Sequence, residues 1–329
     1  MQIIFLFFCF VFIYSGCKGQ KPFGENLLLK QKTIPLTGIK GRIDHMDVNL
    51  KEQIVYVAAL GNNSLEIVDI NRKNVLHSIK GLDEPQGVAY IPQQQEIFVA
   101  NGGNGDCYFY NSKSFEKTGT IHLSSDADDV RYDSTDKKIY VGYGDGGIAV
   151  IEAESHQQIA NIKLPAHPEG FQLDKQRNKL FVNIPDAKQI AVIDLKQYKI
   201  INIWSTGELR ANFPIALDTI HHHIFIGYRH PAKLVMMNEG TGLIISSADM
   251  VSDVDDVYID ETTETIFASG GGGIICIYQW QNLILKQVAY ISTSSGARTS
   301  LLIPGLKIFV LAARADQNNK AALQVYRTD

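Results

Sequence analysis

Short apolar segments alternate with polar turns along nearly the whole chain, and residues 129–164 show the pattern well. This stretch reads DVRYD, a polar turn STDKK, IYVGY, a glycine turn GDGG, IAVIEA, a further turn and QIANIKL. Apolar and β-branched residues alternate over short runs, as in half-buried β-strands, and no stretch keeps a helical period. The pattern predicts four successive strands joined by tight turns.

The same unit recurs with a period of about 42 residues. Its most regular part is an apolar tetrapeptide that occurs seven times: IVYV from Ile54, IFVA from Ile97, IYVG from Ile139, LFVN from Leu180, IFIG from Ile224, IFAS from Ile266 and IFVL from Ile308. Four strands at this period are typical of a β-propeller blade, whereas solenoid repeats are usually shorter and contain fewer strands. Seven repeats predict seven blades.

The two ends of the repeat region complement each other. The last unit, residues 298–329, has only three strand-like segments, SLLIP, KIFVLAA and ALQVYRT. A fourth, LLLKQKTIPL at residues 27–36, precedes the first complete unit. Pairing these segments closes the ring and removes a free sheet edge. We therefore expect one all-β domain over residues 26–329, a seven-bladed β-propeller with four-stranded blades whose last blade is completed by an N-terminal strand.

The seven tetrapeptides, the IAVID and IAVIE third strands and the glycine turns resemble the YVTN-type, YncE-like β-propeller repeat proteins. The resemblance covers roughly residues 26–329 and implies a propeller fold. It implies less about function, because the group includes binding proteins and the wider superfamily includes quinoprotein dehydrogenase subunits and lactonases.

Composition and charge exclude one class of partner. The chain has 31 Lys and Arg against 35 Asp and Glu, a formal net charge of -4. Proteins that bind phosphate backbones are normally basic. Nucleic acid is therefore not an expected partner.

The N-terminus predicts export. Residues 3–14 are apolar, too short a run to span a bilayer but suited to a signal peptide. Ser15, Gly16 and Cys17 resemble a bacterial lipobox, although Tyr14 departs from it and an ordinary secretory signal is the alternative. We expect a lipoprotein signal peptide at 1–16, lipidation of Cys17, a linker at 17–25, and location in the periplasm or cell envelope, with acyl chains as the only membrane attachment.

The two cysteines of the repeat region, Cys107 and Cys276, fall in different blades. We therefore expect neither a disulfide nor a cysteine-based metal site.

Strand direction sorts the loops onto two faces. The turns between first and second strands, and between third and fourth, form one face of ordinary polar turns, and the cluster at residues 221–223, HHH, is interpreted as one of these turns rather than as a metal site. The segments leading into each blade and the second-to-third turns form the other face, where charged, amide and glycine residues concentrate. Function in propellers tends to lie on such a loop face.

Aligning the starts of the inner strands predicts which residues surround the channel mouth. The first tier is Asp44, Gln86, Asp128, Glu169, Phe213, Asp255 and Arg298, and the second tier is His45, Gly87, Asp129, Gly170, Pro214, Asp256 and Thr299. His167 stands two positions before Glu169. Six carboxylates in these tiers predict a strongly acidic mouth.

Two interpretations of the acidic residues stay open. An aspartate at the head of an inner strand accepts backbone hydrogen bonds from a neighbouring loop, but Asp129 and Asp256 have no aspartate counterpart in four other blades. Alternatively the mouth binds a cation or a cationic or polyhydroxylated ligand. The ligand-binding candidates are Asp44, Gln86, Asp128, Asp129, Glu169, Asp255, Asp256 and Arg298. Calcium or magnesium would be held by Asp128, Asp129, Asp255 and Asp256.

An exported binding or scaffold protein, with a small ligand or a protein partner at this face, is the leading functional hypothesis. A metal-assisted hydrolase or lyase of lactone or sugar-like substrates is the alternative, with His45, His167, Glu169 and Arg298 as the catalytic candidates. An accessory subunit of a redox enzyme is the third. No nucleophile elbow, phosphate loop or HExxH motif supports a sharper assignment.

Overall fold

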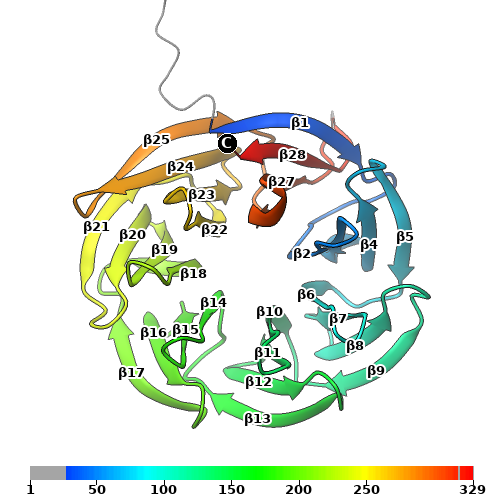
Figure 1. Ribbon diagram of the computed structural model, residues 1–329, viewed down its shortest axis with the longest axis horizontal. Coiled ribbons are helices and arrows are strands. Elements are labelled where there is room, and N and C mark those ends of the chain that lie inside the picture. The colour runs from blue at the N-terminus through cyan, green and yellow to red at the C-terminus, as the bar shows by residue number, and fades with distance from the viewer. Residues whose placement is uncertain (1–26, 318, 329) are drawn as a thin grey trace, which may run out of the picture.

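The computed structural model describes residues 27–317 and 319–328, and they form seven four-stranded antiparallel sheets arranged in a ring (Figure 1). Blades 1 to 3 comprise β2 (Met46–Asn49), β3 (Ile54–Ala59), β4 (Ser64–Asp69) and β5 (Asn74–Lys80); β6 (Pro85–Ile91), β7 (Glu96–Asn101), β8 (Asp106–Asn111) and β9 (Lys117–His122); and β10 (Ala127–Asp133), β11 (Lys138–Tyr143), β12 (Gly147–Glu152) and β13 (Gln157–Lys163).

The other four blades have the same order. They comprise β14 (Phe171–Asp174), β15 (Lys179–Ile184), β16 (Gln189–Asp194) and β17 (Lys199–Ser205); β18 (Arg210–Asp218), β19 (His223–His230), β20 (Ala232–Asn238) and β21 (Ile244–Asp249); β22 (Val254–Asp260), β23 (Thr265–Gly270), β24 (Ile274–Gln281) and β25 (Ile284–Ser292); and β26 (Ser300–Ile303), β27 (Ile308–Ala313), β28 (Ala322–Thr328) and β1 (Leu28–Pro35). Two short 3-10 helices, η1 (Leu60–Asn62) and η2 (Pro304–Leu306), lie in turns.

The apolar tetrapeptides form the second strands, and neighbouring blades bury both faces of each of them. In β3, every residue of Ile54–Ala59 is buried, and Phe98 of β7 shares a buried cluster with Ile139 and Val141 of β11 in the next blade. A strand covered on both faces has no solvent side to require polar residues, which explains the continuous apolar runs. Packing between blades thus forms the core.

The ring closes as the sequence predicts. Strand β1 pairs antiparallel with β28, with Leu28 opposite Thr328 and Pro35 opposite Ala322. The last blade therefore combines both ends of the described chain, and the predicted seven-bladed fold with N-terminal closure is confirmed.

Two faces follow from the strand directions. We call the face with the blade-leading segments and the second-to-third turns the upper face, and the opposite one the lower face. Strand β1 starts on the lower face, because Leu28 pairs with Thr328, whose backbone N–H donates to the carbonyl of Lys307 in the lower turn of blade 7.

Cys107 and Cys276 are both buried and free, as expected from their separate blades. Within residues 27–317 and 319–328, no helix has the length and apolarity needed to cross a membrane. The predicted signal peptide, linker and lipidation site at Cys17 lie outside the described residues.

Candidate functional site at the upper channel mouth

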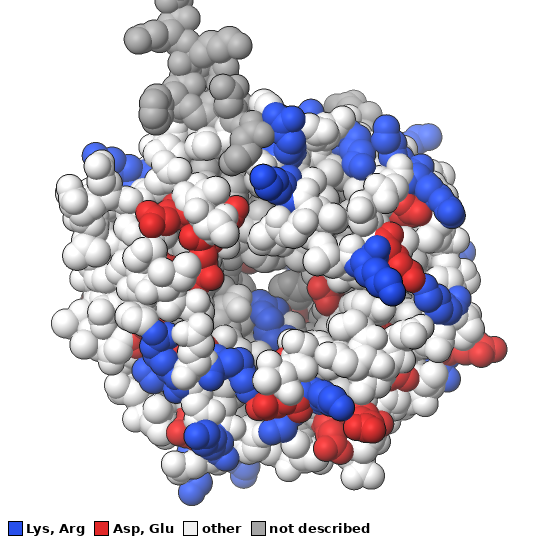
Figure 2. All heavy atoms as spheres, in the orientation of Figure 1, with Lys and Arg blue, Asp and Glu red and all other residues white. Residues whose placement is uncertain are grey.

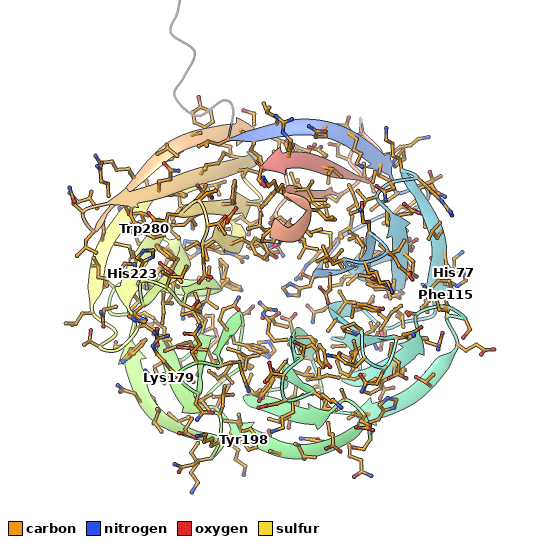
Figure 3. All side chains as sticks on the ribbon, viewed as in Figure 1. His77, Phe115, Lys179, Tyr198, His223 and Trp280 are labelled. Atoms are coloured by element: carbon orange, nitrogen blue, oxygen red, sulfur yellow. The ribbon has the colours of Figure 1, made fainter. Side chains whose placement is uncertain are left out.

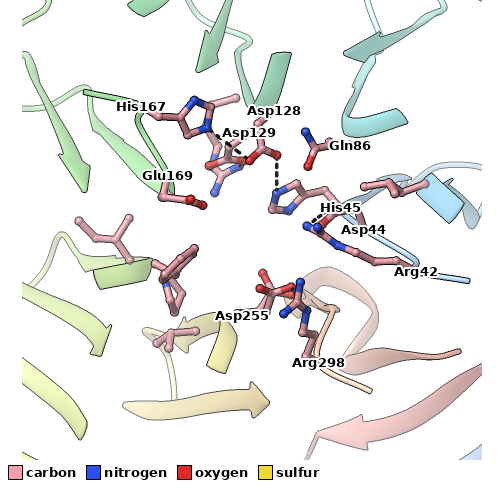
Figure 4. A pocket seen from close by; sticks show the side chains of 18 of the residues that line it. Arg42, Asp44, His45, Gln86, Asp128, Asp129, His167, Glu169, Asp255 and Arg298 are labelled. Atoms are coloured by element: carbon pink, nitrogen blue, oxygen red, sulfur yellow. Dashed lines mark hydrogen bonds and ion pairs between the residues drawn. The ribbon is translucent and has the colours of Figure 1, made fainter. Parts of the chain in front are cut away.

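A cavity of about 520 Å³ lies at the upper mouth of the central channel, and the sequence-aligned residues converge on it (Figure 4). The whole first tier lines it: Asp44, Gln86, Asp128, Glu169, Phe213, Asp255 and Arg298. So do five second-tier residues: His45, Asp129, Gly170, Pro214 and Asp256. His167 also lines it, as its position before Glu169 suggested, whereas Gly87 and Thr299 do not line it.

A β-bulge explains how two consecutive acidic residues both reach one cavity. Side chains alternate between the faces of a regular strand, so adjacent residues normally point apart. The pairing of β10 with β11 shifts register between Ala127 and Val130, and that of β22 with β23 shifts between Val254 and Asp256. A bulge re-aims side chains locally. The bulges therefore turn both acidic pairs toward the channel.

The strongly acidic mouth expected from the alignment is wrong in one respect, because four arginines line the same cavity. Only Arg298 belongs to the aligned tiers; the others are Arg42, Arg131 and Arg229. Figure 2, which views the ring from the side opposite to Figure 4, shows the molecule hollowed at its centre, with blue and red side chains around the opening on that side as well. The mouth is a mixed ionic surface.

On the blade 6 side, two guanidinium groups enclose the first-tier carboxylate. Arg229 donates to Asp255 Oδ1 at 2.8 Å, and Arg298 Nε lies 3.2 Å from Asp255 Oδ2. Arg298 also donates to Asp253 at 3.0 Å. The Arg229 guanidinium stacks over the Phe213 ring at 3.7 Å from its centroid, a cation–π contact that fixes both side chains. Each carboxylate oxygen of Asp255 thus faces a permanently charged guanidinium group.

On the blade 3 side, two imidazoles take the place of the guanidinium groups. His45 Nε2 lies 3.5 Å from Asp128 Oδ1, and His167 Nε2 lies 3.9 Å from Asp128 Oδ2. His167 Nδ1 is 2.7 Å from the carbonyl oxygen of Gly144, which orients the ring. Figure 4 shows Asp128 between the two rings.

Burial and this contact together set the charge of the three groups. Burial opposes the ionised form of Asp128, but the two imidazoles outweigh it and hold the pKa of Asp128 well below its usual range. Burial likewise works against the charged imidazoles, yet Asp128 raises the pKa of His167 to about 9 and that of His45 well above 6.5. At neutral pH the group is a carboxylate between two imidazolium ions.

Glu169 differs from the other first-tier carboxyl groups. Burial, with Asp128 nearby, raises the pKa of Glu169 to about 8. Its backbone N–H donates to the carbonyl of Asn183, but among the described residues its carboxyl group has no hydrogen bond or ion pair, and Figure 4 shows it pointing into the cavity. Asp44, in contrast, is bound by Arg42 at 2.6 Å, and Gln86 donates to Asp126 at 2.9 Å. Glu169 is a protonated carboxyl group available to a ligand.

The second-tier aspartates join blades. Asp129 Oδ2 accepts a hydrogen bond from the backbone N–H of Phe171 in the next blade at 3.3 Å, and Asp256 Oδ2 accepts one from Ser300 at 2.6 Å. Asp129 also pairs with Arg131. This is the interblade role that the sequence left open beside a ligand role, and it occupies both carboxylates.

Glycines explain why two other blades lack the aspartate. A Cβ on Gly87 would lie 2.0 Å from the carbonyl oxygen of Asp128, and one on Gly170 would lie 2.6 Å from that of Phe213. Gly170 instead donates its backbone N–H directly to Phe213 at 3.2 Å. Blades 2 and 4 therefore approach their neighbours through the backbone, which a side chain would prevent.

The four metal candidates do not form one cluster. Within residues 27–317 and 319–328, no group of three or more His, Cys, Asp or Glu side chains is placed to hold a metal ion. Asp128 faces two imidazoles that carry protons, whereas Asp255 faces two guanidinium groups. The geometry gives no support to the calcium or magnesium hypothesis.

The lower face has a cavity that its ordinary polar turns did not predict. A second cavity of about 990 Å³ opens there, and it shares five residues with the upper one, namely His45, Arg131, Gln172, Asp256 and Tyr258. The cavities are two ends of one channel. The histidine cluster lies away from it. His221 and His222 lie in the predicted turn, where His221 Nδ1 is 2.9 Å from Asp218 Oδ2, whereas His223 is the buried first residue of β19 and packs near Trp280 (Figure 3).

Comparison with known proteins extends this description only at the level of the fold. No protein-family model matches the chain, and no curated protein sequence matches it. Solved structures do match the chain. One, titled "Crystal Structure of Mitotic Checkpoint Complex", has a TM-score of 0.78 at 16% sequence identity and covers 98% of each chain. Another, the WD40 repeats of RRP9, has a TM-score of 0.79 at 9% identity and covers 94% of this chain and 99% of that one.

A third, "Structure of U3-55K", gives a TM-score of 0.78 at 9% identity, covering 93% of this chain and 100% of that one. Identities this low establish architecture alone. The chain is a seven-bladed β-propeller similar in structure to WD40-repeat propellers, with a charged cavity at one mouth of its channel.

Proposed function

We propose that this protein is an exported, lipid-anchored binding protein of the YVTN-type propeller group, and that its upper cavity takes a small polyhydroxylated ligand such as a neutral saccharide. One observation carries the ligand class: the permanent charges of the mouth are paired within the protein, while the carboxyl group of Glu169 stays unpaired and protonated at neutral pH.

Hydroxyl-rich ligands match this arrangement better than ions do. A cation entering the cavity meets Arg42, Arg229 and Arg298, and an anion meets the carboxylates that these arginines already bind. A neutral hydroxylated molecule avoids both penalties, because a carboxyl group both donates and accepts hydrogen bonds, as a sugar hydroxyl does. Gln86 and the imidazole of His167 offer further polar contacts on the same wall.

A hydrolase or lyase acting on a lactone is the second candidate, and the position of His167 supports it. A proton donor with a pKa of about 9 lines the same cavity as a carboxyl group with a pKa of about 8, and both are suited to general acid catalysis near neutral pH. Turnover of a lactone by the parent protein, lost in His167→Gln and Glu169→Gln alike, would select this function over binding alone.

Thermal shift with a panel of neutral mono- and disaccharides tests the binding proposal. At least one sugar should raise the Tm of the parent protein by several degrees. Glu169→Leu should abolish that shift and Glu169→Gln should reduce it, whereas Glu154→Gln, an exposed change on the lower face, should leave it intact. A Tm that responds to calcium chloride and to no sugar would replace the proposed ligand class with a divalent cation.

Fractionation tests the anchor. The parent protein should sediment with membranes and Cys17→Ser should be released into the soluble fraction. Membrane retention of Cys17→Ser equal to that of the parent would mean that lipid on this cysteine does not hold the protein.

A further inference from the structure

Five large apolar side chains project from the lower face of blades 5 and 6. Their exposed fractions are Ile220 58%, Leu243 68%, Ile244 57%, Leu283 53% and Ile284 54%. We call these five residues the lower apolar patch. Large aliphatic side chains this exposed are unremarkable singly, but their concentration on one part of a surface marks a site of interaction.

Three turns of the lower face carry the patch. Ile220 lies between β18 and β19, Leu243 and Ile244 lie at the start of β21, and Leu283 and Ile284 lie at the start of β25. These are first-to-second and third-to-fourth turns, so all three point the same way.

Contacts across the blade boundary hold the turns side by side. The ring of His221, which follows Ile220, lies 5.8 Å from that of Trp280 in β24, and the N–H of Leu285 donates to Ser246 Oγ at 3.0 Å. Figure 3 shows Trp280 and His223 close together at this boundary. The patch is therefore one surface shared by two blades.

Other exposed large apolar residues do not add to it. They lie on blade 1, on the outer strands of blades 3 and 4, and on the far part of β25, and they are Leu50, Leu76, Ile159, Ile201, Ile203 and Tyr290.

The described chain begins on the same face as the patch, in the neighbouring blade. Leu28 lies at the lower end of β1 and packs into the cluster that contains Phe267 and Ile275 of blade 6. In Figure 1, β1 starts beside β25. The described chain therefore begins on the lower face, in the blade next to the one that carries Leu283. Residues 18–27 span about 35 Å at most when fully extended, so lipid on Cys17 would hold this face within that distance of the bilayer.

We infer that the lower apolar patch rests in the surface of the membrane to which the protein is anchored. The inference rests on the anchor in the proposed function and adds to it an orientation. Acyl anchors commonly work with a second membrane contact, and apolar side chains on protruding turns supply one. The upper cavity then faces away from the bilayer, open to solutes.

The charge around the patch says which lipid contact to expect. The turns that carry it contain no Lys or Arg, and Glu264, exposed on the neighbouring turn, lies 3.4 Å from the ring of His221. Arg177 and Lys179 of blade 4 reach the turn before Leu243, but both are paired there with Glu239, at 3.5 and 3.7 Å. Basic residues are what attract proteins to anionic lipid headgroups. The contact is therefore apolar, and it should form on zwitterionic phosphatidylcholine as well as on anionic membranes.

Site-specific fluorescence in the full-length lipidated protein tests the orientation. An environment-sensitive NBD label is attached to Leu283→Cys in the patch, to Ser114→Cys in the corresponding lower turn of blade 2, and to Asp145→Cys on the upper face, all exposed positions. Cys107 and Cys276 are buried, and the unsubstituted protein labelled in parallel gives the background. In phosphatidylcholine vesicles the Leu283→Cys label should shift to the blue and be quenched at least twofold by bromolipids. The two control labels should do neither.

A second variant separates this inference from the anchor. Flotation of Cys17→Ser with phosphatidylcholine vesicles should show weak binding that falls several-fold in Leu243→Ser/Leu283→Ser. A label at Leu283→Cys that stays water-exposed in anchored protein would overturn the orientation and leave the anchor standing. A blue shift that needs high protein concentration and no lipid would assign the patch to a second copy of the chain instead. Equal membrane binding by the parent and by Cys17→Ser, lost from both on Leu243→Ser/Leu283→Ser substitution, would remove the anchor and keep the patch.

Discussion

The segments leading into blades 3 and 6 have nearly the same sequence, DADDVRYD at residues 126–133 and DVDDVYID at residues 253–260. Both begin with an aspartate in the left-handed region, Asp126 at φ 39° and Asp253 at φ 52°, and both contain a bulge that turns an acidic pair toward the channel. In both, the second acid of the pair accepts a hydrogen bond from the backbone of the next blade. The two segments therefore have the same structural role, which is to link each blade to the next one.

They differ in what faces the first acid of the pair. Asp255 lies between two guanidinium groups, whose charge is permanent, whereas Asp128 lies between two imidazoles, whose charge depends on pH. The residue two positions after each pair differs as well, Arg131 in one blade and Tyr258 in the other. A repeated motif thus keeps its interblade role while its partners on other blades give each copy a different electrostatic character.

Removing a permanent cation should have the largest effect. Arg229→Gln deprives Asp255 of one buried partner, breaks the stack on Phe213 and should lower the free energy of unfolding by about 3 kcal/mol. Lys233→Gln is the matched control, because its partner Asp249 is exposed and the pair is screened by solvent, so this change should leave the free energy of unfolding nearly unchanged. Urea denaturation measures both. Equal costs in the two variants would show that Asp255 does not depend on Arg229.

The shared interblade bond should come next. Asp256→Ala leaves the buried N–H of Ser300 without an acceptor and should cost about 2 kcal/mol. Asp256→Asn keeps an acceptor oxygen and removes a carboxyl group whose pKa burial and Asp255 raise to about 7, so it should cost less than about 1 kcal/mol.

Asp129→Ala should behave like Asp256→Ala if the two copies are equivalent. A cost confined to one blade would break the structural equivalence of the motifs, and urea denaturation of all three variants decides between these outcomes.

The fold could be predicted from the sequence because its signals are local and repeated. The continuous apolar tetrapeptides indicate second strands that are buried on both faces. The last unit lacks a fourth strand, and residues 27–36 are the strand-like segment that can supply it. The two tiers were also predictable, since aligned positions in equivalent blades must meet at the axis.

The charge balance of the mouth could not be predicted from the tiers. Arg229 comes from the end of a second strand, and Arg42 from a segment before the aligned positions, so their approach depends on the closed ring. Arg131 left a usable signal, because it follows Asp129 by two positions and strand alternation returns it to the channel side. The glycines at the second-tier positions were also misinterpreted from the sequence. The absence of aspartate at Gly87 and Gly170 reflects close backbone contact between blades rather than a dispensable position.

The pH dependence of the free energy of unfolding is the smallest effect that we expect to distinguish the two segments. The pKa of each imidazole is raised in the folded state, so its stabilisation is complete below about pH 6.5 and is lost as pH rises through about 9, the pKa of His167. His45→Gln/His167→Gln should therefore flatten the decline in the free energy of unfolding between pH 6.5 and 9 by about 1–2 kcal/mol. Arg298→Gln should lower stability by the same amount at both ends of this window, because a guanidinium group does not titrate there. Denaturation at pH 6, 7, 8 and 9 supplies the curves. If the double histidine variant keeps the parent slope, the charge on blade 3 is as permanent as that on blade 6, and the difference between the two copies of the motif lies in geometry alone.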